Sequence, residues 1–185
     1  LFVESTYGDR LHKNLPSTID ELAHAINDTL YRKKGNVIIP AFAVGRTQEI
    51  IYFLHDLTRQ GRFKNLNIYV DSPMATKATD ITMRHMEMFD DEARSLTAWL
   101  AKNHIPLKLT FTGSAEESIA LNSIHSGAII ISSSGMCDAG RIKFHLINNL
   151  GKRQNTILIT GFQAQGTLGR RLVDGAKTAR IYGKE

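Results

Sequence analysis

A segment rich in small and polar residues, 132–141, contains the most groups in the chain that could bind a ligand. It reads Ser-Ser-Ser-Gly-Met-Cys-Asp-Ala-Gly-Arg and follows a run of three isoleucines. Backbone amides and hydroxyls in such a loop favour an anion, as does the N-terminus of a helix that follows it. The guanidinium of Arg141 adds a bidentate donor that suits phosphate. The segment therefore predicts a phosphate site with contacts from Ser133, Ser134, Gly135 and Arg141.

Polar residues also follow three other apolar runs that predict strands. In an open α/β sheet the carboxyl ends of parallel strands lie at one edge, where ligands bind. Each residue alone also has an ordinary structural explanation, as a helix cap, a turn residue or an ion-pair partner. Their shared position after strands favours a common binding edge. The further candidates for substrate or phosphate binding are Arg46, Thr47, Asp71, Ser72, Gln163 and Thr167.

No complete catalytic apparatus is visible in the sequence. The seven histidines, at positions 12, 24, 55, 85, 104, 125 and 145, form no pair with metal-ligand spacing. The phosphate-loop, dinucleotide and nucleophile-elbow motifs are absent as well. We expect His145 to be an exposed helix residue and Cys137 to be an ordinary loop cysteine. The residues thus predict a binding edge without metal ligands.

Composition sets broad limits on the protein class. A chain of 185 residues with 42% hydrophobic content predicts one globular domain. Its net charge of +5 is compatible with an anionic partner such as nucleic acid but does not require one. The single cysteine excludes an internal disulfide and fits a reducing, cytoplasmic compartment. No apolar run approaches the roughly 18 residues that predict a membrane span.

The elements that position these residues follow from hydrophobic periodicity. Short apolar runs alternate with longer segments of helical spacing, which is typical of a parallel sheet. We therefore predict an α/β fold, with a mostly parallel open sheet and helices on both faces, in one domain spanning 1–185. The predicted strands are 1–4, 37–40, 66–70, 107–110, 129–131, 156–160 and 179–182. The predicted helices are 17–34, 50–57, 74–88, 90–102, 114–124, 142–150 and 167–173.

Five motifs occur in order along nearly the whole chain. They are Glu4–Arg10 (ESTYGDR), Ile39–Glu49 (IPAFAVGRTQE), Asp71–Ala75 (DSPMA), Ser133–Arg141 (SSGMCDAGR) and Gly161–Arg170 (GFQAQGTLGR). This series resembles the β-CASP region of metallo-β-lactamase-superfamily nucleases that process RNA. The resemblance covers the bacterial and archaeal members and the nuclease subunit of the pre-mRNA 3′-end cleavage factor.

The resemblance implies a Rossmann-like cap domain of a zinc-dependent ribonuclease. Two zinc ions would be held by a flanking metallo-β-lactamase domain of the same polypeptide, and the cap would bind single-stranded RNA. Glu4 matches the acidic residue of the family's motif A, which implies a catalytic support role in orienting a metal-site histidine outside this chain. The H-x-H-x-D-H metal motif is missing from this sequence. We therefore expect the chain to be a fragment of a larger protein, with no catalytic zinc and no cleavage of its own.

Two other interpretations stay open. The chain could be a stand-alone module that binds a nucleotide or phosphate group. It could also be a non-catalytic structural domain of an RNA-processing complex. Each interpretation is compatible with oligomerisation. The reading frame on either side of the chain would distinguish the nuclease cap domain from these two alternatives.

Overall fold

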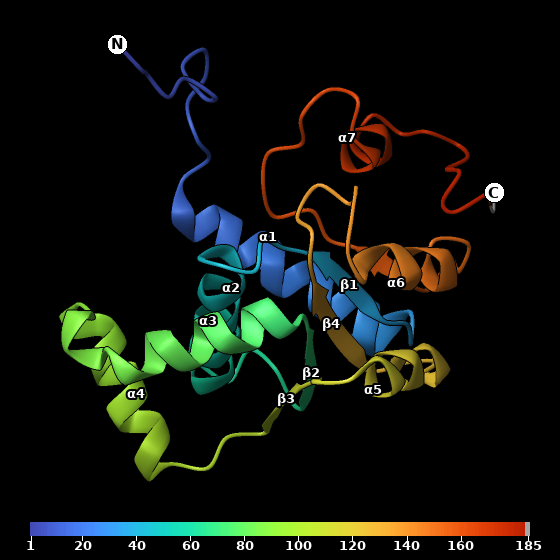
Figure 1. The fold of residues 1–185 in the computed structure, drawn as a ribbon. Helices are drawn as coiled ribbons and strands as arrows, with labels where there is room; N and C mark the ends of the chain where they lie inside the picture. The colour runs from blue at the N-terminus through green and yellow to red at the C-terminus, as the bar shows by residue number, and fades with distance from the viewer. Residues whose placement is uncertain (184–185) are drawn as a thin grey trace.

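The structure, a computed structural model, describes residues 1–183 and centres on a parallel five-stranded sheet (Figure 1). The strands are β1 (Val37–Pro40), β2 (Leu66–Asp71), β3 (Leu107–Phe111), β4 (Ala128–Ser132) and β5 (Thr156–Ile157). Their spatial order is β3-β2-β4-β1-β5, and every pairing is parallel. The predicted α/β fold is therefore confirmed. Residues 184–185 of the predicted domain lie outside the described residues.

Helices connect the strands along the chain. They are α1 (Leu15–Asn27), α2 (Arg46–Arg59), α3 (Pro73–Arg84), α4 (Asp91–Lys102), α5 (Ala115–Ala120), α6 (Ile142–Asn149) and α7 (Leu168–Val173). Three short turns of helix, Asp28–Arg32, Met86–Met88 and Leu121–Ser123, continue or join them. Among the helices of the described residues, none has the length and apolar composition to span a bilayer.

The sheet separates two apolar cores, because successive side chains of a strand point to opposite faces. Ile39 and Ile129 face a core formed with α1, α2 and the start of α3. Ile38 and Ile130 face a second core, formed with α6 and the turn after α5. Both faces of the central strands are thus buried, as their continuous β-branched runs indicate.

The connections after neighbouring strands leave the sheet on opposite sides. Helices α2 and α3, which follow β1 and β2, contribute to the first core, whereas α6, which follows β4, packs in the second. Strand β4 lies between β2 and β1. The loop 133–141 therefore emerges at a reversal of strand order, which is the position where open α/β sheets bind ligands.

Two predicted strands are wrong. Residues 1–4 are exposed and form no strand, because no described segment lies beside them to complete a hydrogen-bond ladder. Residues 179–182 form only an isolated bridge at Ile181, whose side chain is buried in the second core. Strand β5 ends at Ile157 rather than at 160.

Helix α1 begins two residues before its predicted start. The side chain of Asn14 accepts a hydrogen bond from the Ser17 amide at 2.8 Å, and a proline occupies the first turn. Asn14 is therefore the cap of α1. The helix predicted over 74–88 ends at Arg84 and is followed by a short 3-10 turn.

Gly140 closes the loop 133–141, and we expect Gly140→Ala to destabilise the fold strongly. Its φ of 81° costs about 1–3 kcal/mol for a residue with a side chain. An added Cβ would also lie 2.3 Å from the Ser133 carbonyl oxygen. Gly61→Ala is the matched control, because its φ is 74° and nothing lies within 4 Å. Urea unfolding measures both; equal losses of stability would contradict a tightly closed loop.

Candidate functional site

A buried carboxylate, Asp71, lies at the end of β2 and joins three neighbouring segments. Its side chain is 0% exposed. One carboxylate oxygen, Oδ1, accepts hydrogen bonds from the hydroxyl of Thr112 and from Nη1 of Arg141, the latter at 2.8 Å. The other, Oδ2, accepts from Ser118 Oγ and from His145 Nε2, both at 2.6 Å. We call these five residues the Asp71 cluster.

The cluster keeps Asp71 ionised in spite of its burial. Burial by itself raises the pKa of this carboxyl group, but hydrogen bonds from His145, Ser118, Thr112 and Arg141 outweigh it. The pKa of Asp71 is therefore held well below its usual range. A fully hydrogen-bonded buried charge of this kind fixes the position of every group that donates to it.

Arg141 connects the cluster to the surface. Its Nη1 atom makes the contact with Asp71 and a longer contact, 3.5 Å, with the Thr112 hydroxyl. The side chain remains 24% exposed. Within residues 1–183 its Nε and Nη2 groups have no hydrogen-bond partner, so two edges of the guanidinium remain for an anion. Arg141 can therefore pair with Asp71 and still contact a phosphate, as the two sequence-based explanations for this residue require.

The loop 133–141 after β4, here called the serine loop, is held by hydrogen bonds to Ser72 and within itself. Ser133 Oγ donates to Ser72 Oγ at 3.0 Å, and Ser72 itself caps α3 by accepting from the Ala75 amide. The Ser134 hydroxyl accepts from the Ala139 amide at 3.3 Å. Ser133 and Ser134 are half-buried, whereas Ser72 is buried. The two loop serines thus retain access to solvent and Ser72 acts as their support.

The loop after β1 lies beside the serine loop. The Ala41 amide donates to the Ser132 carbonyl oxygen at 3.0 Å. Thr47 is buried, and its hydroxyl donates to the Phe42 carbonyl oxygen at 2.8 Å, so it shapes the turn and does not face solvent. Arg46 is half-exposed and paired with Glu49. Of this pair of candidates, Arg46 is the one whose side chain a ligand can reach.

Gln163 and Thr167 brace the loop from the C-terminal side. Gln163 is buried, and its Nε2 donates to the Gly135 carbonyl oxygen at 2.9 Å. Thr167 caps α7 by accepting from the Arg170 amide at 3.1 Å. In this structure both side chains, like those of Asp71 and Thr47, are bonded within the chain. They form the frame of the candidate site, and Arg46, Ser134 and Arg141 form its accessible part.

Glu4 lies apart from this edge in the exposed N-terminal segment. Its carboxylate accepts from the Thr6 amide at 2.7 Å. Hydrogen bonding by the Thr6 side chain, and then by this amide, lowers the pKa of Glu4. The group is therefore ionised at neutral pH. Among the described residues no histidine is bonded to it, and its role in orienting a metal-site histidine stays a prediction.

Sequence reasoning missed His145, which is 1% exposed and bonded to Asp71. The prediction of an exposed helix histidine is therefore wrong. Arg141 and His145 are four residues apart, a spacing that places them on one face of a helix and could have linked them. Thr112 and Ser118 gave no such signal. Cys137 is fully buried, and burial raises the pKa of its thiol to about 12.

Asp71→Asn tests the cluster. Removing one partner of a buried ion pair costs about 3–5 kcal/mol, so we expect a loss of that size at pH 7. Because the folded pKa is depressed, the wild-type advantage is full above the unfolded value of about 3.9. It declines as the pH falls below that value toward the folded pKa. Urea midpoints between pH 3 and 7 check this; a difference independent of pH would contradict an ionised Asp71.

The chain is similar both to a known domain family and to individual curated proteins. Residues 47–172 match the Beta-Casp domain family. The whole chain is 34% identical to "Ribonuclease TTHA0252" of Thermus thermophilus, covering 42% of that protein. It is 34% identical to an "RNase J-like protein" of Methanocaldococcus jannaschii, with 98% of the chain covering 41% of the relative. It is 30% identical to "Transcription termination factor FttA" of Methanosarcina mazei, with 98% covering 29%.

The chain thus spans less than half the length of these curated relatives. The family match extends from the first turn of α2 to the last turn of α7, and so includes the Asp71 cluster, the serine loop and Thr47. The order of motifs, the parallel sheet and these matches agree, and the chain belongs to the β-CASP domain family of the metallo-β-lactamase superfamily.

Proposed function

We propose that this chain is the RNA-binding cap domain of a zinc-dependent ribonuclease. Hydrolysis of the phosphodiester would take place with a metallo-β-lactamase domain of the same polypeptide. The observation that supports this best is the meeting of the loops after β1, β2 and β4 at one sheet edge, with two arginines accessible there. The printed names of two relatives, a ribonuclease and an RNase J-like protein, point to the same substrate class.

The proposed contacts to RNA are to its backbone. Arg46 and Arg141 offer guanidinium groups, and Ser133 and Ser134 offer hydroxyls. Gly135, also predicted as a contact, is buried, and its carbonyl oxygen accepts from Gln163. Such contacts position a strand without reading its sequence. The net charge of +5 favours the approach of a polyanion. The domain would therefore hold a single strand in one orientation and leave the reaction to its neighbour.

The described residues do not fit a zinc centre. Among residues 1–183, no three His, Cys, Asp or Glu side chains are grouped so that they could hold a metal ion. In the proposal the two zinc ions belong to the flanking domain, and Glu4 is the one residue of this chain that would support their ligands.

A binding role without catalysis is the second candidate, because several relatives carry the name of a transcription termination factor. In that case the same edge would hold RNA while partner subunits act on it. Binding alone does not separate the two proposals, whereas cleavage by the full-length protein does.

Arg46→Ala should weaken binding of a single-stranded oligoribonucleotide about fivefold to tenfold. It should also reduce the slope of log affinity against log salt by about 0.7, the value for one lost phosphate contact on a single strand. Arg84→Ala is the matched control, because Arg84 also pairs with a carboxylate on its own helix and lies on α3. Fluorescence anisotropy over a range of salt measures both. Equal affinities for wild type and Arg46→Ala would contradict a phosphate role.

The chain itself should hold no zinc and cleave no RNA. Atomic absorption after dialysis against zinc, followed by an RNA-cleavage assay, should give blank results in both measurements. Stoichiometric zinc, or cleavage that a chelator abolishes, would show that this chain contains metal ligands of its own and would overturn the division of roles proposed here.

A further inference from the structure

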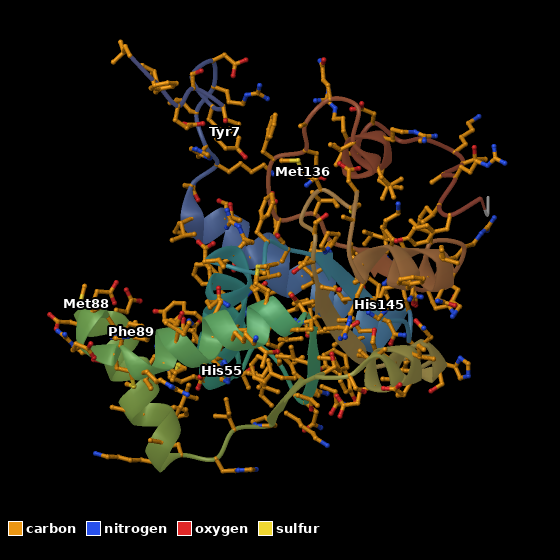
Figure 2. The ribbon with its side chains drawn as sticks, in the orientation of Figure 1. Tyr7, His55, Met88, Phe89, Met136 and His145 are labelled. Carbon is orange, nitrogen blue, oxygen red and sulfur yellow. The ribbon has the colours of Figure 1, made fainter. Side chains whose placement is uncertain are left out.

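A small cavity opens beside Arg46 where three loops and the N-terminal segment meet. Its volume is about 210 Å³. Phe42 and Arg46 line it after β1, Gly135 and Met136 line it after β4, and Phe162 lines it after β5. Tyr7, from the N-terminal segment, completes it, and Figure 2 shows Tyr7 and Met136 at the same end of the molecule. This volume is below the range of about 300–1,000 Å³ typical of drug-sized pockets, and so suits one ring system.

Three aromatic residues, Tyr7, Phe42 and Phe162, line this cavity. Phe42 is 48% exposed and Tyr7 is 36% exposed. Tyr7 and Phe162 meet edge to face, with ring centroids 6.0 Å apart. Three aromatic residues from distant parts of the sequence thus converge on one solvent-accessible space. Such a wall is typical of a surface on which a planar ring stacks.

The position of Phe42 is fixed by the serine loop. A Cβ added at Gly135 would lie 3.0 Å from the Phe42 ring and 3.1 Å from its backbone nitrogen. The ring therefore rests directly on the Gly135 backbone, which Gln163 holds in turn. Phe42 thus packs against Gly135 on one side, and 48% of its surface remains exposed.

Polar groups accompany the rings. Arg46 lines the same cavity, so a cation lies next to the aromatic wall. Thr160 also lines it, and the Thr160 hydroxyl is buried without a hydrogen-bond partner among the described residues. A buried hydroxyl costs free energy unless it is hydrogen-bonded. A ligand with a planar ring, a polar edge and an adjacent negative charge would satisfy all of these groups.

We propose that this cavity is a nucleobase site. One base of a single RNA strand stacks against Phe42 and Tyr7, its edge bonds to the Thr160 hydroxyl, and its phosphate contacts Arg46. The inference rests on the proposed RNA-binding function and deepens it, because it adds a base contact to a site otherwise described by backbone contacts. Stacking accepts any base, so the site would add affinity with weak sequence preference.

The test compares two ligands of equal charge, an octamer of riboadenylate and an abasic ribose-phosphate octamer. Wild type should bind the base-containing octamer about tenfold more tightly. Phe42→Ala should remove that preference and leave the affinity for the abasic octamer unchanged. Phe144→Ala is the matched control, because Phe144 is 52% exposed but lies on α6 against Tyr182. Thr160→Val should reduce the preference by a smaller factor.

A second measurement stands independently of the stability of the Phe42 variant. Tyr7→Trp in a Trp99→Phe background places the sole indole at the cavity. Its fluorescence should be quenched by the riboadenylate octamer and not by the abasic one. Equal affinity of wild type for both octamers, or equal quenching by both, would overturn the nucleobase site alone. Failure of wild type to bind either octamer would overturn the proposed function together with this inference.

Discussion

The arrangement depends on one buried charge. Asp71 is fully enclosed at the end of β2, and its two oxygens accept four hydrogen bonds from three different segments of the chain. An uncompensated carboxylate could not remain in such a place. Its four donors stabilise it, and in exchange their positions are fixed by it. The loop after β3, the helix α5 and the helix α6 are thereby tied to a single point of the sheet edge.

The accessible part of the site follows from that constraint. Arg141 lies at the start of α6 with Nη1 on Asp71, and within residues 1–183 its Nε and Nη2 groups have no hydrogen-bond partner. The same loop supplies Gly135, on which Phe42 rests beside Arg46. A buried layer of hydrogen bonds thus supports a surface layer of two cations and several aromatic rings. Under the proposed function, the phosphates and bases of a single RNA strand would match both parts of that surface.

The sequence predicts the fold well wherever the signal is local. The β-branched runs at 37–40 and 129–131 are continuous, which is typical of strands buried on both faces. These runs therefore identify the central strands. The segments 1–4 and 179–182 contain only one β-branched residue and one charged residue each. Strand formation also needs a neighbouring strand, which the sequence does not display. For the site, the positions after strands are visible, whereas burial is not. His145 is buried, and its hydrogen-bond partner Asp71 lies 74 positions earlier in the chain, so no local pattern links the two. The sequence likewise does not indicate that Phe42 lies against Gly135 and remains 48% exposed.

Under the proposed function, Asp71 holds the Arg141 guanidinium in place for a phosphate. Side-chain NMR of arginine nitrogens measures this most directly. In the free chain the Nη protons of Arg141 should give resolved, slowly exchanging signals, unlike those of exposed Arg84. These signals should shift on addition of the abasic ribose-phosphate octamer while the contact to Asp71 persists. A single averaged signal in the free chain, or no shift at saturating ligand, would contradict the account.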